Sequence, residues 1–201
     1  MTPEQVKALL DRTKKLGETD EMFKRDYDFY TIAVGTGLRL SEVAHLEKGD
    51  ILPERVMVTR RKKKTLHPTP IDVMPHVHEI LKRRAAAVEE GYIFPGRAKP
   101  CIIHRQSKKD GPREEQVCIG GHCSLRSIQR RWRLALEALD LYLYGRGIHT
   151  MRHVAITNVY NVTKDLRLAQ VFAGHSSSTI TERYAHLCDV RETLAKLPVM
   201  A

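Results

Sequence analysis

Long hydrophobic runs are the first thing that this 201-residue sequence lacks. No apolar run approaches the roughly 20 residues that a membrane-spanning helix needs, and the N-terminal sequence MTPEQVKALLDRTKK has no apolar segment of the signal-peptide kind. Internal repeats and low-complexity tracts are also missing. The sequence therefore predicts a cytoplasmic protein without a membrane partner, and its 42% hydrophobic residues are enough for the core of one sizeable domain.

Cysteine is scarce, with four residues in a chain that has no secretion signal, which excludes a disulfide framework. Cys101-x-x-His104 and Cys118-x-x-x-His122 do have spacings that suit a structural zinc site. We interpret them instead as reduced side chains in a polar insertion, because short motif matches often arise by chance. The sequence thus predicts neither a metal nor a cofactor.

Acidic residues are outnumbered, with 24 Asp and Glu against 34 Lys and Arg, so the formal net charge is +10. This excess favours a polyanionic partner over an acidic small substrate.

Helical signals dominate what is present, and they predict a mainly α-helical fold with a small antiparallel β-sheet. Thr2 and Pro3 open a first helix that ends before Gly17; Asp20 caps a second, which Gly37 ends in a left-handed conformation. Further helices are predicted after an N-cap at Ser41, over residues 75–90, from an N-cap at Ser124 to residue 140, from about residue 150, over 166–173, after Ser177 or Ser178, and over 189–197.

The helix after Ser124 is expected to place Trp132 in the core. Its arginines are expected mainly on the outer surface, where some could meet phosphates: Arg126, Arg130, Arg131 and Arg133.

Strands are predicted over residues 50–51, 56–60 and 65–71. The last two flank the basic sequence Arg61-Lys62-Lys63-Lys64, which makes a hairpin with a charged tip. Residues 97–123 are polar and without periodicity, which suits a surface loop over DNA or a small appended element.

Two separate motifs carry the chemistry. In the first, Thr36-Gly37-x-Arg39 precedes Glu42 and Leu46, and it places Arg39 beside the positive N-terminal end of a short helix. In the second, His149-x-x-Arg152 opens a helix and is followed by Gly174-His175 and then by Tyr184. The N-terminus of that helix attracts anions.

In this order the motifs resemble the two conserved boxes of the tyrosine recombinase (phage integrase) family. The resemblance extends over nearly the whole chain and implies the catalytic fold of that family. It implies that Tyr184 is the nucleophile, whereas Tyr142 and Tyr144 lack the flanking His and Arg. It also implies a catalytic Lys on the hairpin, eight residues before a Pro; counting back from Pro70 gives Lys62, and Lys63 and Lys64 remain alternatives.

The residue types suit attack by a phenolate on a DNA phosphodiester. Two guanidiniums, Arg39 and Arg152, match the charge that develops on the non-bridging oxygens. His175 can donate to the same phosphate, and His149 has a pKa suited to deprotonating Tyr184 or orienting the phosphate. Glu42 is interpreted as orienting a basic partner. The covalent phosphotyrosine conserves the bond energy, so neither ATP nor a divalent metal is needed.

We therefore expect site-specific DNA recombination or integration through a covalent 3′-phosphotyrosine, as in phages and mobile elements, by an enzyme associated with the nucleoid. Residues 1–201 are expected to form the catalytic domain, with the insertion at 97–123 and a C-terminal tail at 185–201 that packs in cis or on a neighbouring protomer. The helical DNA-binding domain that family members carry upstream is absent, so we expect a fragment of a longer recombinase or a natural minimal form, self-associating as a dimer or tetramer on DNA. The alternatives are a type IB topoisomerase-like or telomere-resolving enzyme, and a non-catalytic DNA-binding regulator.

Overall fold

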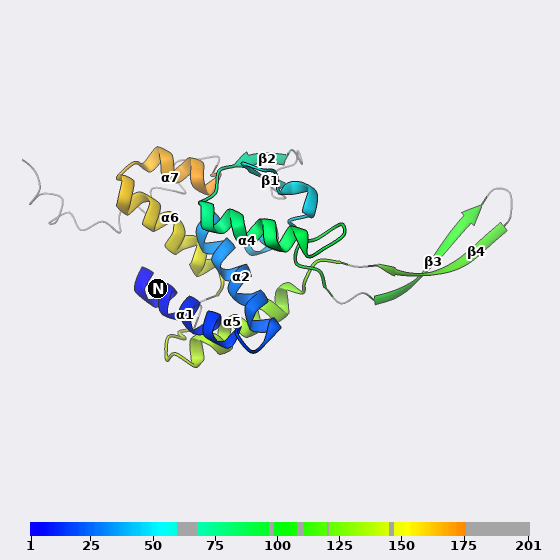
Figure 1. Cartoon of the computed structure of the whole chain (residues 1–201), viewed down its shortest axis with the longest axis horizontal. Helices are drawn as coiled ribbons and strands as arrows, with labels where there is room; N and C mark the ends of the chain where they lie inside the picture. The colour runs from blue at the N-terminus through cyan, green and yellow to red at the C-terminus, as the bar shows by residue number, and fades with distance from the viewer. Residues whose placement is uncertain (60–67, 97–98, 108–110, 120, 145–146, 176–201) are drawn as a thin grey trace, which may run out of the picture.

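The computed structural model describes residues 1–59, 68–96, 99–107, 111–119, 121–144 and 147–175, with the backbone alone for 99–107 and 111–119. Figure 1 shows a body of helices with one small sheet on its surface and a long β-hairpin that projects from it. Among the described residues, no helix is long and apolar enough to cross a membrane. The predicted fold class, mainly α-helical with a small antiparallel sheet, is confirmed.

The elements of the described residues follow the chain in this order: α1 (Pro3–Leu16), α2 (Glu21–Thr36), α3 (Leu40–Ala44), the 3-10 helix η1 (Lys48–Asp50), β1 (Val56–Thr59), β2 (Pro68–Ile71), α4 (Pro75–Ala86), β3 (Lys99–Ser107), β4 (Gly111–Ile119), α5 (Leu125–Glu137), α6 (His149–Thr163) and α7 (Leu166–Ala173). β1 pairs antiparallel with β2, and β3 pairs antiparallel with β4.

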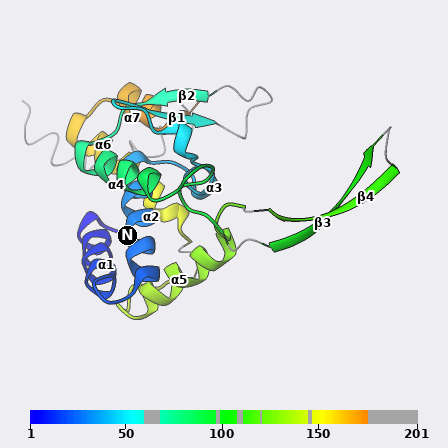
Figure 2. The same ribbon diagram turned by 45° about the vertical axis from the view of Figure 1, so that its right-hand side comes forward.

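Helix α2 is the centre of the body, and α1, α4, α5 and α6 lie around it (Figures 1 and 2). Its aromatic side chains explain why it is buried. Phe29 meets Phe94 with ring centroids 5.0 Å apart, and Tyr30 meets Trp132 at 5.2 Å, both edge to face. Edge-to-face pairs add about 1 kcal/mol to the stabilisation from the buried area. Trp132 is 1% exposed, so its predicted place in the core is confirmed.

The predicted helix ends are mostly correct because capping is local chemistry. The Thr2 hydroxyl accepts from the Gln5 N–H, an Asp20 carboxylate oxygen accepts from the Met22 N–H at 2.7 Å, and Gly37 adopts φ 60°. Three boundaries differ, and one of them is the end of α5, at Glu137 instead of residue 140. Helix α4 ends at Ala86 instead of residue 90, and α3 begins at Leu40, so its N-cap is Arg39 and not Ser41.

The strand predicted at residues 50–51 is wrong. Lys48–Asp50 forms a 3-10 turn instead, and only Ile51 makes an isolated bridge, to Val56. An Asp50 carboxylate oxygen accepts from the Glu47 N–H at 2.9 Å, and this local bond competes with the extended conformation.

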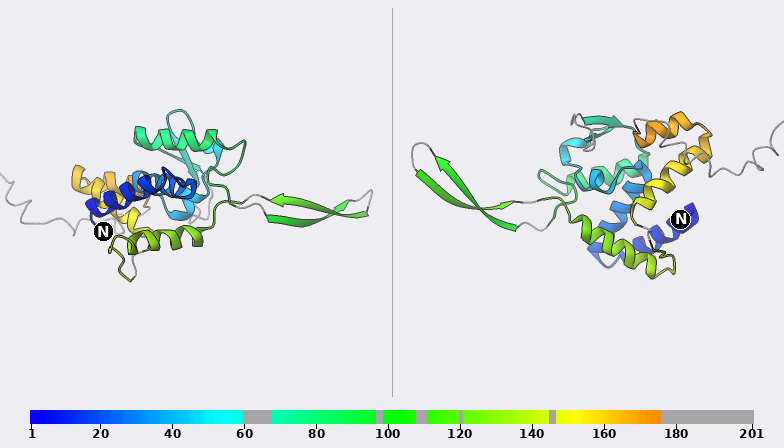
Figure 3. Two further views of the ribbon diagram at one scale, coloured as in Figure 1. Left: turned by 60° about the horizontal axis from the view of Figure 1, so that its bottom comes forward. Right: turned by 180° about the vertical axis from the view of Figure 1, so that it is seen from behind.

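Residues 97–123 contain a hairpin that the sequence pattern did not reveal. The antiparallel register of β3 and β4 runs from Lys99 opposite Ile119 to Ser107 opposite Gly111. Figures 1 to 3 show the hairpin reaching away from the helical body in every view. Neither face of such a ribbon lies on the core, so the alternation of apolar and polar residues that identifies a half-buried strand is not required.

Arg131 corrects a further expectation. It lies on the inner side of α5 and donates from Nε and Nη2 to the two carboxylate oxygens of Asp26, at 2.5 and 2.7 Å. The Asp26 side chain is only 3% exposed, so this bidentate pair joins α5 to α2. Arg126, Arg130 and Arg133 are exposed, as expected.

Candidate functional site

The candidate site begins at the turn between α2 and α3. Gly37 ends α2 in the left-handed conformation, which directs the chain back across the end of the helix. Two residues later Arg39 is extended, with φ −70° and ψ 151°, and it stands at the N-terminus of α3. Its guanidinium is partly exposed, with 25% of the side chain accessible, while the turn around it is buried.

Glu42 holds Arg39 in this position. One of its carboxylate oxygens accepts from the Arg39 backbone N–H at 2.8 Å, and the other accepts from the guanidinium Nη1 at 2.9 Å. The Glu42 side chain is 2% exposed, so the orientation that it imposes is fixed by packing. These are the contacts expected of a carboxylate that orients Arg39. The guanidinium N–H groups that do not bond Glu42 can donate to another acceptor.

Arg152 joins the two sequence motifs. It lies one turn inside α6, is 7% exposed, and donates from Nη1 to the Gly37 carbonyl and from Nη2 to the Ala173 carbonyl at 2.7 Å. Gly37 precedes Arg39, and Ala173 precedes Gly174 and His175. One buried guanidinium therefore holds together two turns that are more than a hundred residues apart in the chain.

The close approach of those turns depends on the absence of a side chain at Gly37. A Cβ there would lie 2.6 Å from the Phe172 ring, closer than real contacts allow. Phe172 belongs to α7, so the missing Cβ lets α7 approach the end of α2. The same residue supplies the left-handed dihedral angles and the space, which explains the glycine of the first motif.

His175 follows the helix end formed by Gly174, which has φ 61°. Its backbone N–H donates to the Gln170 carbonyl at 3.1 Å, and its carbonyl accepts from the Gln170 side-chain amide at 3.2 Å. Gln170 is 7% exposed and also accepts from Arg167 at 3.1 Å. The sequence analysis did not predict that Gln170 supports the His175 turn. The signal that could have indicated it was an amide side chain within the last two turns of the helix before Gly174-His175.

His149 is the first residue of α6 and is exposed, one turn from Arg152. His153 lies one turn after His149 and directly follows Arg152. Desolvation of the covered part of its ring, followed by the nearby His149 and Arg152, lowers the pKa of His153 below its ordinary value. His149, Arg152 and the positive end of the helix therefore lie together at the N-terminal turn of α6.

Of the six predicted catalytic residues, the structure therefore brings Arg39, Arg152 and the backbone of His175 together, with His149 one turn from Arg152. Lys62 and its alternatives Lys63 and Lys64 lie outside the described residues, as do Tyr184 and the tail at 185–201. The described strands β1 and β2 do form the predicted hairpin on either side of residues 60–67, with Met57 opposite Pro70.

Of the candidate zinc ligands, His122 has a described side chain, and it stacks on His45 with ring centroids 3.9 Å apart. Each ring places Nδ1 next to a backbone carbonyl, of Ser41 at 2.6 Å for His45 and of Cys123 at 2.7 Å for His122. Across the part of the chain that the structure describes, no three His, Cys, Asp or Glu side chains are grouped to hold a metal ion. The stack connects the base of the β3–β4 hairpin to the segment that follows Glu42.

The class of protein follows from these motifs and from comparison with known proteins. Residues 1–191 match the model of the phage integrase family, and the chain belongs to this family. It is 28% identical over 198 residues to tyrosine recombinase XerC of Rhodospirillum centenum, covering 96% of this chain and 53% of the relative. It is 28% identical over 193 residues to tyrosine recombinase XerD of Chlamydia trachomatis serovar D, covering 93% and 57%.

The fold is likewise shared with solved structures. The XerH site-specific recombinase in its post-cleavage complex with palindromic difH substrate superposes with a TM-score of 0.72 at 18% identity, over 97% of this chain and 51% of that one. This likeness concerns the fold. The chain spans about half the length of the relatives that it matches.

Proposed function

We propose that this chain is the catalytic domain of a tyrosine recombinase that cuts and rejoins double-stranded DNA in site-specific recombination. The observation that carries the proposal is the contact set of Arg152, which assembles Arg39 and the Gly174-His175 turn at one place. The relatives XerC and XerD are named tyrosine recombinases, and the +10 charge of the chain suits a polyanionic substrate.

In the proposed reaction, the Tyr184 oxygen attacks a DNA phosphorus and the bond from phosphorus to the 5′-oxygen breaks. The products are a 3′-phosphotyrosine and a free 5′-hydroxyl. Arg39, Arg152 and the His175 ring donate to the non-bridging oxygens, where negative charge accumulates. His149 accepts the proton of Tyr184, and Lys62 protonates the leaving 5′-oxygen. Rejoining reverses these steps, so the reaction consumes no external energy.

Arg152 is suited to its role because of what it already contacts. Its two described bonds go to carbonyl oxygens, which are dipoles and carry no net charge, so these bonds position the guanidinium without neutralising it. Arg39 is held by Glu42 from one side only. Fixed donors need no reorganisation when charge develops, and each such donor contributes about a hundredfold to a thousandfold in rate.

The proposal extends to partners and location. The chain is expected to associate with further copies of itself on DNA, as a dimer or tetramer, and to act in the cytoplasm at the nucleoid. The transposase B of transposon Tn554 is 28% identical over 168 residues, which supports a role in a mobile element or phage. Residues 97–123 are proposed as an insertion into the catalytic domain and 185–201 as its C-terminal tail.

A covalent trapping experiment tests the proposal. A nicked suicide substrate, from which the cleaved end diffuses away, should accumulate a covalent protein–DNA adduct that survives denaturing electrophoresis. Tyr184→Phe removes only the nucleophilic oxygen, so it should bind the same DNA with unchanged affinity and form no adduct. Tyr142→Phe and Tyr160→Phe are the matched controls and should form it normally. An adduct that maps to any tyrosine other than Tyr184, or no adduct with the unmodified chain, contradicts the proposal.

The proton donor has its own test. A 5′-bridging phosphorothiolate replaces the leaving oxygen by sulfur, which departs without a proton. Lys62→Ala should cleave ordinary DNA very slowly and the sulfur substrate nearly as fast as the unmodified chain does, while Arg39→Ala should gain nothing from sulfur. Rescue of Lys63→Ala or Lys64→Ala instead would reassign the role, and rescue of none would exclude the hairpin lysines.

A further inference from the structure

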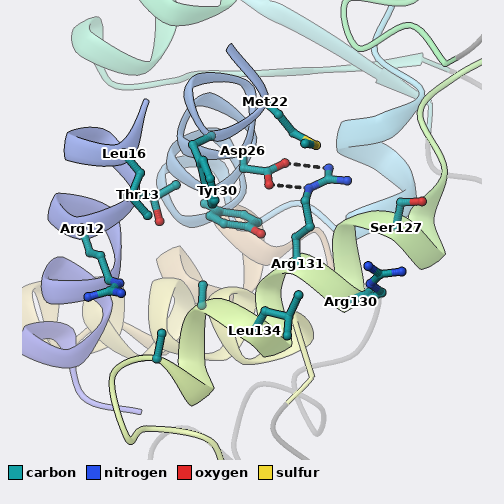
Figure 4. Close-up of a pocket in the computed structure, with 13 residues that line it drawn as sticks. Arg12, Thr13, Leu16, Met22, Asp26, Tyr30, Ser127, Arg130, Arg131 and Leu134 are labelled. Atoms are coloured by element: carbon teal, nitrogen blue, oxygen red, sulfur yellow. Dashed lines mark hydrogen bonds and ion pairs between the residues drawn. The ribbon is translucent and has the colours of Figure 1, made fainter. Parts of the chain in front are cut away.

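A cavity of about 480 Å³ lies between α1, α2 and α5 (Figure 4), nearer the N-terminal end of α2 than the end at Gly37. Three apolar side chains at its mouth remain substantially exposed: Leu16 at 38%, Met22 at 50% and Leu134 at 50%. Large apolar side chains that cluster around a concavity mark a binding site more often than scattered ones do. A single ligand can cover all of them and remove their apolar surface from water. The cavity is mostly apolar inside.

Three arginines stand around this apolar space: Arg12 on α1, and Arg130 and Arg131 on α5. The single carboxylate that lines it, Asp26, is occupied by both of its bonds to Arg131. In the described part of the chain, neither Arg12 nor Arg130 makes an ion pair or a side-chain hydrogen bond. The cavity therefore carries two uncompensated positive charges at its rim.

Tyr30 also lines the cavity, and its hydroxyl is buried behind the wall. Tyr30 is 1% exposed, and its hydroxyl has no hydrogen-bond partner among the described residues. Figure 4 shows the hydroxyl end of the ring pointing toward α5, beside the Asp26–Arg131 pair. Burial and the Asp26 carboxylate raise the pKa of Tyr30 far above its ordinary value, so the group stays a neutral O–H donor. Because this oxygen is closed off from solvent, a ligand in the cavity would not contact the Tyr30 hydroxyl itself.

We propose that this cavity binds a small organic anion, a carboxylate with an aliphatic or aromatic body. The body would fill the space between Leu16, Met22 and Leu134, and the carboxylate would meet Arg130 on the α5 side of the rim. Arg12, on the opposite side, adds to the positive potential of the cavity (Figure 4). The volume lies in the range of small-molecule pockets, roughly 300–1,000 Å³, whereas a stable protein partner needs about 800 Å² of flatter surface on each side. Anionic charge complements the rim, and an apolar body complements the interior.

This site is separate from the proposed chemistry. Asp26 and Gly37 are eleven residues apart along α2, roughly 16 Å on the helix axis. A ligand in the cavity would contact α1, α2 and α5 together and would stabilise the helix that ends at Gly37. Its binding can be measured without DNA, so failure of this proposal and failure of the proposed function are distinguishable.

Titration of the full chain with the fluorescent probe 8-anilinonaphthalene-1-sulfonate, with decanoate as competitor, tests the proposal. We expect one saturable probe site per chain, displaced by decanoate and much less by decan-1-ol of the same chain length. Arg12→Gln combined with Arg130→Gln should raise the decanoate Kd about tenfold, through the loss of one charge-assisted contact and of the positive charge opposite it. Arg126→Gln, on the same helix but outside the cavity, is the matched control and should change nothing.

Two further variants address specific atoms. Tyr30→Phe removes only an oxygen that is closed off from the cavity, so it should leave the decanoate Kd and the midpoint of thermal unfolding unchanged and serves as a second control. Leu134→Glu places a negative charge at an already exposed position and should abolish binding in a folded chain, as circular dichroism would verify. Probe binding that is not saturable, or that is unchanged by Leu134→Glu or by the combined arginine variant, overturns the proposal. So does displacement by duplex DNA but not by decanoate, since Arg12 and Arg130 would then be phosphate contacts.

Discussion

The two ends of α2 use arginine in opposite ways. Near its N-terminal end, Arg131 gives both of its described bonds to the Asp26 carboxylate, and the two charges cancel. Beyond its C-terminal end, Arg152 gives its described bonds to the carbonyls of Gly37 and Ala173, which cancel no charge. The comparison teaches that the burial of an arginine says little about its role. The acceptor of each bond decides whether that bond pairs two opposite charges or only positions the guanidinium.

Arg152→Lys should show the largest difference between the two ends. A lysine cannot reach two carbonyls and a phosphate with one ammonium group, so single-turnover cleavage at saturating DNA should fall by about a hundredfold to a thousandfold. Arg131→Lys is the matched control. At temperatures where this variant is folded, its cleavage rate should stay within severalfold of that of the unmodified chain. An equal loss in both variants would show that the two arginines do not differ in this way.

The charge pair at the other end should dominate stability. Asp26→Asn leaves the half-buried Arg131 without its carboxylate and should lower the free energy of unfolding by about 3 kcal/mol in urea titrations. Replacement of both residues, Asp26→Leu with Arg131→Met, should recover most of this loss, because no charge is then left buried. If the double variant is as unstable as the single one, packing and not charge is what the pair supplies.

Gly37→Ala tests the contact between α2 and α7. The left-handed φ of 60° and the 2.6 Å approach to Phe172 both disfavour a side chain, so unfolding free energy should fall by about 2 kcal/mol. Cleavage should fall as well, because the Gly37 carbonyl would shift relative to Arg152. Adding Phe172→Leu should relieve the steric part and leave the dihedral part. A Gly37→Ala chain with unchanged stability and cleavage would contradict this account of Gly37.

The smallest expected effect concerns acid. The pKa of His153 is lowered in the folded chain, so between its folded value and its ordinary value near 6.5 the unfolded chain binds more protons. Stability should therefore be unaffected above about pH 7.5 and should fall as the pH is lowered through the ordinary value. His153→Gln should flatten this part of a plot of thermal midpoint against pH. An unchanged slope would assign the acid sensitivity to other groups.

Local capping chemistry made most of the body predictable. Thr2, Asp20 and Ser124 begin helices, and Gly37 and Gly174 end them in left-handed conformations, because these effects involve neighbours within one turn. The β3–β4 hairpin was not predictable in the same way, since a ribbon that projects from the body has no buried face to impose a pattern. The bonds of Arg131 and Gln170 were missed because their partners depend on how separate helices pack.

The sequence by itself determined the helical class, the basic charge and the order of the two motifs, since composition, helix caps and spacing are properties of the chain. Which guanidinium bonds a carboxylate and which bonds carbonyls was decided only by tertiary structure. So were the approach of Phe172 to Gly37 and the cavity below Tyr30. These features join residues tens to more than a hundred positions apart, and such distances close only when the hydrophobic core around α2 brings the helices together.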